Sequence, residues 1–112
     1  MSSRIQLIAT IKVKAGKETE TDLLLRSLLK PTHQEAGCIR YALHRSLQDM
    51  RTYYFIEEWR SQEDLQKHLN SHHITAVMQR KNELLDLLDI TFVSPIPGGD
   101  PAKEAIWDFS RS

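Results

Sequence analysis

The sequence predicts an α+β domain, and three observations support this fold class. Apolar and polar residues alternate in four segments, which is the two-residue period of a β-strand. Before the second and before the fourth of these segments, apolar residues are spaced as on one face of a helix. A short connection joins the second and third segments, so these strands are expected to pair antiparallel. The resulting order, β-α-β-β-α-β, is typical of a ferredoxin-like fold with a four-stranded antiparallel sheet.

The beginning of the chain supplies one strand and one helix. The strand is expected over residues 4–14, where every second residue is apolar. The helix is expected to begin at Lys17 and to bury a leucine stripe: Leu24, Leu25, Leu28 and Leu29. Pro31 is expected to kink or stop this helix, and Gly37 to close the turn that follows.

A hairpin is expected next. Its strands should cover residues 38–47 and 52–60, with residues 48–51 as the connection. The second of these strands carries the strongest strand signal in the chain, because its aromatic and β-branched residues fit a pleated surface.

Helical residues are expected from there to the last strand. Ser61 followed by Asp64 resembles a capping box, which predicts a helix beginning at Gln62. After a pause at residues 70–71, a second helical stretch is expected over residues 73–85. The positions expected to face inward are Leu65, Leu69, Ile74, Val77, Met78 and Leu84.

The last strand is expected over residues 88–94, so the folded domain should comprise residues 1–96. Prolines and glycines follow, and residues 97–112 are expected to form a tail. The tail either docks its apolar side chains on a neighbouring subunit or is a disordered end. Those side chains are Ile106, Trp107 and Phe109.

Composition excludes several classes of protein. The 112 residues fit one domain, and 15 basic residues balance 15 acidic ones, so the positive field of a nucleic-acid-binding protein is absent. No apolar run approaches the roughly 20 residues that span a membrane. The single cysteine, Cys38, cannot form an internal disulfide, which suits the cytoplasm, and no basic neighbour activates its thiol.

The second face of the sheet is expected to meet another copy of the chain. Ile8, Tyr54 and Ile56 point to that face, which no helix covers. Because symmetric dimers are the commonest oligomers, we expect a homodimer that packs sheet to sheet.

Glu57 is the most informative candidate for chemistry. The strand period places its side chain on one face with Tyr53, Phe55 and Trp59. A carboxylate among aromatic rings is costly to desolvate, so its pKa is expected to rise toward neutrality, which suits a general base. The alternative is that Glu57 lies near a strand end and pairs with an arginine or histidine.

His68 and His73 are expected to converge on a cavity between helix and sheet and to relay protons. The alternative is that they cap helix ends or are solvated. Their spacing is not that of metal ligands, so no metal site is expected. Of the other histidines, His33 and His72 are expected at the surface, and His44 against a partner subunit.

Aromatic and thioether side chains are expected around the same cavity. Tyr41 and Tyr53 either donate hydrogen bonds to a bound carbonyl or pack in the core. Phe55, Trp59 and Met78 are expected to contact a substrate as part of the apolar wall, or to be packing alone.

Three stretches resemble the antibiotic biosynthesis monooxygenase family. Residues 35–41 read EAGCIRY, residues 55–59 read FIEEW and residues 68–73 read HLNSHH, in the order and spacing of that family. The resemblance covers about residues 4–96. It implies a dimeric α+β barrel and, in enzymatic members, oxygenation of a phenolic or quinol substrate without flavin, haem or metal.

The resemblance also implies roles for individual residues. Glu57, His68 and His73 match recurrent polar pocket residues, and Tyr41 and Trp59 match aromatic ones. Haem degradation is not expected, because this chain lacks the residue pattern of the haem-degrading branch of the family. The isomerase branch, which acts on a phosphorylated sugar, keeps both histidines but has tyrosine at the Trp59 position.

The resulting hypothesis is a cofactor-free monooxygenase that oxidises a small phenolic, quinol or polyketide-like substrate with O2. Glu57 or His68 is the base, His73 and Tyr53 are hydrogen-bond partners, and the aromatic residues form the wall. Two alternatives remain: an isomerase of a small phosphorylated metabolite, and a non-catalytic dimeric module that binds a ligand in the same pocket.

Overall fold

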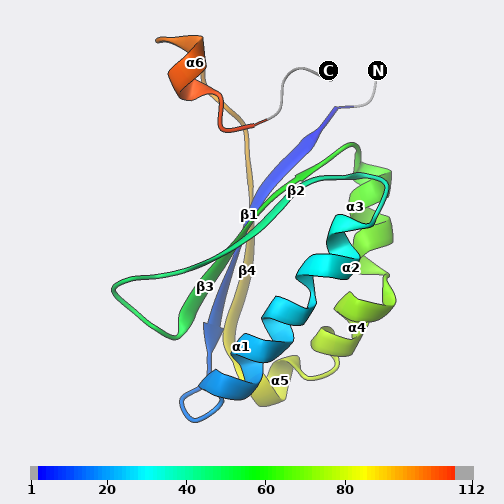
Figure 1. Cartoon of the computed structure of the whole chain (residues 1–112), viewed down its shortest axis with the longest axis vertical. Coiled ribbons are helices and arrows are strands. Elements are labelled where there is room, and N and C mark those ends of the chain that lie inside the picture. Colours follow the sequence, from blue (N-terminus) through cyan, green and yellow to red (C-terminus); the bar gives the residue numbers. More distant parts are fainter. Residues whose placement is uncertain (1–2, 108–112) are drawn as a thin grey trace.

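The computed structural model describes residues 3–107 and contains one four-stranded sheet (Figure 1). The strands are β1 (Ile5–Val13), β2 (Cys38–Arg45), β3 (Thr52–Trp59) and β4 (Leu85–Val93). Their order across the sheet is β2-β3-β1-β4, and every neighbouring pair is antiparallel. This arrangement confirms the predicted α+β, ferredoxin-like fold class.

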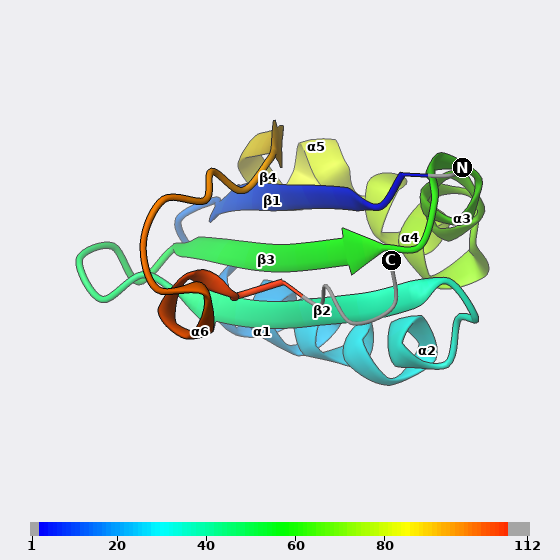
Figure 2. The same cartoon turned by 90° about the horizontal axis from the view of Figure 1, so that it is seen from above.

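Helices cover one face of this sheet. The helices of the described residues are α1 (Glu18–Ser27), α2 (Leu29–His33), α3 (Gln62–Leu69), α4 (His72–Met78), α5 (Lys81–Leu84) and α6 (Pro101–Glu104). Figure 1 shows α1 to α5 along one side of the sheet and α6 on the other side. In the view from above, α2 lies beside β2 and α5 beside β4, and both pairs are in contact (Figure 2).

The first helical region differs from the prediction in where it breaks. The helix ends at Ser27, before Pro31, and Pro31 lies inside the short helix α2. Pro31 occupies the third position of α2, where a backbone N–H would have no intrahelical acceptor in any case. The missing N–H of proline is therefore tolerated at this point.

The boundaries near β4 and β2 also differ from the prediction. The stretch expected as one helix over residues 73–85 is divided into α4 and α5, and β4 begins at Leu85 rather than at residue 88. Pairing with β1 extends the strand, because Val13 opposes Leu85 across an irregularity in the register. The second strand ends at Arg45, two residues before Leu47, which is 91% exposed.

The core lies between the sheet and the helices. The predicted inward face of β1 is confirmed, since Leu7, Ala9, Ile11 and Val13 are all buried. Two residues expected to face the core are partly exposed instead, with Leu69 at 37% and Met78 at 43%. Both lie at the border of a cavity that is described below.

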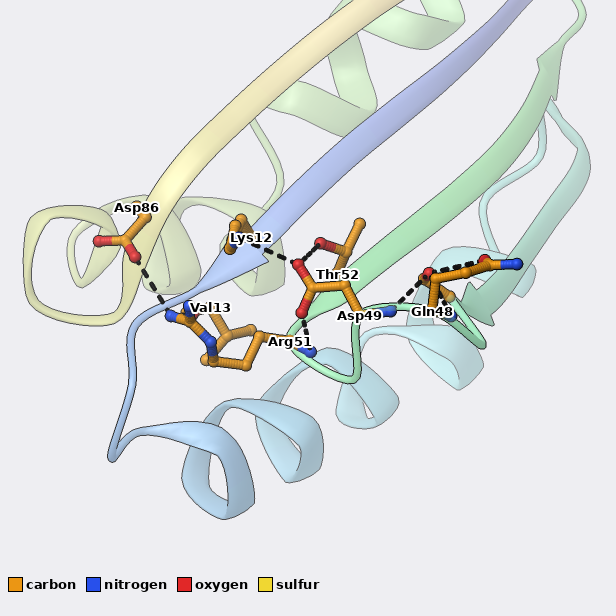
Figure 3. A network of polar contacts seen from close by, with 8 residues as sticks. Lys12, Val13, Gln48, Asp49, Arg51, Thr52 and Asp86 are labelled. Atoms are coloured by element: carbon orange, nitrogen blue, oxygen red, sulfur yellow. Dashed lines mark hydrogen bonds and ion pairs between the residues drawn. The ribbon is translucent and has the colours of Figure 1, made fainter.

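The connection between β2 and β3 is fixed by a polar network (Figure 3). The Asp49 carboxylate accepts hydrogen bonds from the Thr52 hydroxyl at 2.9 Å and from the Arg51 backbone N–H at 3.0 Å, and it pairs with Lys12 of β1 at 3.0 Å. The Arg51 guanidinium donates to the Val13 carbonyl at 3.0 Å and reaches Asp86 of β4 at 3.4 Å. The hairpin tip is thus joined to β1 and to β4.

The other face of the sheet has a polar centre. Glu58 is fully buried there and accepts a hydrogen bond from Gln6 at 3.3 Å, with Arg4 at 3.7 Å and Arg40 at 4.0 Å. Trp107 of the tail is only 6% exposed within the single chain. Docking of the tail on a partner subunit stays a prediction.

Two further observations concern the expectations for the whole chain. Phe109, the last apolar residue of the tail, lies outside the described residues. No helix in the described part of the chain has the length and apolar character needed to cross a membrane.

Candidate active site

A cavity of about 80 Å³ lies between the inner face of the sheet and the helices. Most of its lining is aliphatic and comes from β1, α1, α4 and β4. Its polar groups come from β2, β3 and α3 and are Tyr41, Glu57 and His68. The cavity reaches the surface beside the exposed residues of its lining, which are Leu69, Met78 and Ile90.

Glu57 faces this cavity because the register of β3 turns it inward, opposite Leu7 of β1 and Tyr41 of β2. Its side chain is buried, and the indole N–H of Trp59 donates a hydrogen bond to Oε1 at 2.9 Å. Burial raises the pKa of Glu57 to about 7, although the Trp59 hydrogen bond acts in the opposite direction. This agrees with the expected rise toward neutrality and gives a carboxyl group that can exchange a proton near neutral pH.

His68 lines the same cavity as Glu57 and is only 3% exposed. Its ring packs against Trp59 with 4.4 Å between ring centres and against Tyr41 with 5.3 Å. Burial lowers the pKa of His68, while the neighbouring Glu35 carboxylate opposes the change. The neutral imidazole is therefore favoured at the cavity wall.

Glu35 is the functional candidate that the sequence reasoning missed. Its Oε2 atom is 3.0 Å from Nδ1 of His68 and 2.8 Å from Nε2 of His73, so one carboxylate oxygen binds both rings. Because a carboxylate only accepts hydrogen bonds, each of these ring nitrogens acts as the donor. Nδ1 of His68 then carries the proton, which leaves Nε2 as the acceptor of the neutral ring.

The signal for Glu35 was present in the sequence, but no local spacing could reveal it. The residue stands in the EAGCIRY stretch, separated from His68 by 33 positions and from His73 by 38. Only the packing of the turn before β2 against α3 brings these residues together.

A close approach at Gly37 sets this packing. A Cβ atom at Gly37 would lie 2.2 Å from Cβ of Asp64, so only glycine fits against α3 there. The Arg60 backbone N–H also donates to the Gly37 carbonyl at 2.9 Å. Asp64 is held in turn by the predicted capping interaction, because its backbone N–H donates to the Ser61 hydroxyl at 3.2 Å.

His73 reaches Glu35 from the outer side and is not part of the cavity wall. Its Nε2 atom also lies 3.3 Å from the Ser71 hydroxyl. Glu35 and Ser71 line an outer pocket of about 250 Å³, together with residues of α3 that include Lys67. The Glu35 carboxylate therefore connects the inner cavity, through His68, with this outer pocket.

Two aromatic candidates occupy different places. Phe55 lines the cavity and stacks on Tyr41 with 4.6 Å between ring centres. Tyr53 is not brought to the cavity, because its hydroxyl donates to Asp22 of α1 at 2.6 Å, and Arg45 binds the same carboxylate. The hydrogen bond from Arg26, and after it those from Tyr53 and Arg45, lower the pKa of Asp22 to about 2.

The other residues singled out from the sequence are placed as follows. His33, His44 and His72 are exposed, in agreement with the surface positions expected for His33 and His72. Burial raises the pKa of Cys38 to about 11, consistent with the expected unreactive thiol.

Glu35, His68 and His73 are also the only residues of the described part of the chain that gather as a possible metal-ligand set. Their donor atoms all lie within 4.8 Å of one another. The expectation of no metal site rested on the spacing of the two histidines, whereas the carboxylate that joins them comes from a distant turn.

Comparisons with known proteins agree with this picture. The family model described as antibiotic biosynthesis monooxygenase matches residues 4–80. A solved structure from Pseudomonas aeruginosa is similar with a TM-score of 0.81 and 33% identity, over 87% of this chain and 98% of that one. No curated protein matches the chain.

Two further solved structures are similar to the chain. One is a protein from Mycobacterium tuberculosis with a TM-score of 0.78 and 25% identity, over 88% of this chain and all (100%) of that one. The other is named antibiotic biosynthesis monooxygenase and gives a TM-score of 0.77 and 26% identity, over 83% and 99% of the two chains.

Proposed function

The chain belongs to the antibiotic biosynthesis monooxygenase family, and from this premise we propose that it oxidises a single-ring phenol or hydroquinone with O2, with Glu57 as the base. The observation that carries the proposal is a buried carboxyl group with a pKa of about 7 on the wall of an apolar cavity. A general base is most effective when its pKa lies near the working pH.

The proposed chemistry begins with a proton transfer. Glu57 takes a hydroxyl proton from the bound hydroquinone, and the resulting anion gives one electron to O2. Recombination of the two radicals forms a carbon–oxygen bond, and loss of water leaves a quinone with one new oxygen atom. For hydroquinone itself, one molecule of substrate and one of O2 give one hydroxybenzoquinone and one water, so no external reductant is needed.

The protein contributes a base, a polar partner and a dry site. Glu57 is held by the Trp59 indole, which stabilises its ionised form once the carboxyl has lost its proton. The Glu35 contact orients His68, whose Nε2 atom can accept a hydrogen bond from a hydroxyl group of the substrate. Aliphatic lining excludes water, which would otherwise compete for the substrate anion.

Cavity size supports a small substrate among those expected from the sequence. A volume of about 80 Å³ is near half of the roughly 150 Å³ that holds a benzene molecule in an apolar cavity. A single ring therefore needs only a modest opening, which movement of the flexible Met78 side chain at the surface can supply. A polycyclic substrate would require much larger rearrangement.

A homodimer is part of the proposal. Ile8 and Ile56 lie opposite each other on the face of the sheet away from α1 to α5, and both are only partly buried in the single chain. A second copy on this face would remove them from water.

The small volume of the cavity also favours a second candidate, a dimeric module that binds a ligand without turnover. An isomerase remains a third, because Glu57 and His68 on one wall could move a proton without O2. Oxygen consumption separates these functions, since only the monooxygenase consumes O2 as the substrate disappears.

The test is an oxygen-electrode screen of substituted hydroquinones with the full chain and the Glu57→Gln variant. We expect O2 uptake that falls by about 100-fold or more in the variant, since a general base typically contributes 10²–10⁴-fold. Glu63→Gln, which changes an exposed carboxyl group on α3, is the matched control and should keep full activity. Equal uptake by wild type and Glu57→Gln, or substrate conversion without uptake, contradicts the proposal.

A further inference from the structure

We propose that Glu35, His68 and His73 form a binding site for one divalent transition-metal ion such as Zn²⁺. The site would lie between the inner cavity and the outer pocket, and it goes beyond the proposed oxygenation, which needs no metal. Each ligand comes from a different segment: the turn before β2, the end of α3 and the start of α4.

The distances between the donor atoms support this assignment. Zinc binds imidazole nitrogen at about 2.0–2.1 Å and carboxylate oxygen at about 2.0–2.2 Å, so the ligand atoms of a tetrahedral site stand about 3.3–3.5 Å apart. Oε2 of Glu35 is 3.0 Å from one imidazole nitrogen and 2.8 Å from the other. The two nitrogens are within 4.8 Å of each other and would need to approach by at most about 1.5 Å.

His73 can make most of this movement. Its side chain is 21% exposed and stands at the start of α4, whereas the His68 side chain is only 3% exposed. A metal ion would replace the two protons that now join the rings to the carboxylate, so the same three groups would remain in contact through the ion.

The chemistry of the ligands suits a borderline metal. Two imidazoles and one carboxylate match the donor types that bind zinc with an open fourth position. The outer pocket can supply that position, because Glu35 and Ser71 line it and the Ser71 hydroxyl lies 3.3 Å from Nε2 of His73. Water or an added ligand in this pocket could complete the coordination.

Charges near the pocket do not oppose a cation strongly. Arg60 is already engaged by the Asp64 carboxylate, with contacts of 2.9 and 3.2 Å. Lys67 is exposed to solvent, where its charge is screened. The negative charge of Glu35 is thus the nearest to the proposed ion.

Occupation of the site would change the inner cavity as well. A metal ion on Nδ1 of His68 would place the ring proton on Nε2, so that His68 would become a donor instead of an acceptor. Metal binding at Nδ1 would thus change the hydrogen-bonding role of His68 in the cavity.

The test is a titration of the full chain, first freed of metal with a chelator that is then removed, with ZnCl2 in a calorimeter. We expect one ion per chain and a large loss of affinity in His73→Ala, of about 100-fold, since even residues behind the ligands typically contribute 10–100-fold. His72→Ala is the matched control, because His72 is the adjacent, exposed histidine and should leave the affinity unchanged. Glu35→Gln should also weaken binding.

A second measurement uses CoCl2, whose visible absorption reports nitrogen and oxygen ligands directly. The spectrum should develop at one equivalent with wild type and His72→Ala, and fail to develop with His73→Ala. Absence of Zn²⁺ binding by wild type, or equal weakening by His72→Ala and His73→Ala, overturns the site and leaves the three residues as a hydrogen-bonded relay. Both readouts are independent of turnover, so they do not depend on the outcome of the oxygen-electrode test.

Discussion

Replacement of Glu57 by glutamine should make the protein more stable at alkaline pH while it removes the proposed base. The folded protein raises the pKa of Glu57 from 4.5 to about 7, mainly because burial disfavours the ionised form. Glutamine is close to the same size, carries no charge, and its side-chain oxygen can still accept the Trp59 hydrogen bond. The substitution therefore removes the ionisation penalty with little change in packing.

The magnitude follows from the difference in pKa between the folded and unfolded states. Each pKa unit corresponds to about 1.4 kcal/mol, so the shift from 4.5 to about 7 corresponds to about 3 kcal/mol. Because the folded-state pKa is the higher one, the folded protein retains a proton that the unfolded chain releases between these values. Stability should therefore fall as the pH rises from about 4.5 to 7, and the full penalty should be present above pH 7.

The assay is urea denaturation of wild type and Glu57→Gln at a series of pH values from 5 to 8.5, at one protein concentration. His68, whose burial-lowered pKa gives a pH dependence of the opposite sign, is present in both proteins, so the difference between them isolates Glu57. The stability of the variant relative to wild type should increase by about 2.5 kcal/mol between pH 5 and pH 8.5, because part of the penalty is already present at pH 5. A difference that stays constant across this range would refute the assignment of a buried, easily protonated carboxyl group.

Three further predictions concern positions outside the cavity. Gly37→Ala should lower the melting temperature strongly, because its Cβ would overlap the Asp64 side chain in the first turn of α3, whereas Gly98→Ala, which meets nothing within 4 Å, should not. Tyr53→Phe should keep full O2 uptake but lose about 1–2 kcal/mol of stability in urea denaturation, since its hydroxyl binds the Asp22 carboxylate; a loss of turnover would contradict its position away from the cavity. Alkylation of Cys38 by iodoacetamide at pH 8 should be about 100-fold slower than that of a free thiol, because its pKa of about 11 leaves little thiolate; a rate equal to that of free cysteine would contradict the burial of its sulfur.

Local patterns in the sequence were sufficient for the fold and for part of the site. Alternation along β1 and β3 reports which side chains face a covered surface, and the structure buries Leu7, Val13 and Glu57 as that pattern predicts. The capping residues Ser61 and Asp64 lie within four positions of contiguous chain, so their interaction could be identified without tertiary information.

Other features depended on contacts between distant segments. Tyr53 shares a strand face with Glu57, but the side chains at its end of the strand belong to α1, and the Asp22 carboxylate binds its hydroxyl there. The extension of β4 to Leu85 follows from pairing with β1, which competes with the helical preference of that segment.

The amino-acid order alone determined an inward carboxyl group on the third strand, because side-chain direction in a strand follows from a period of two residues. Only the tertiary structure joined His68 to His73 through Glu35, since the three side chains meet where a turn packs against α3 at Gly37. Proton affinity and metal affinity depend on such distances and on burial, and these are properties of the packed chain that no local pattern contains.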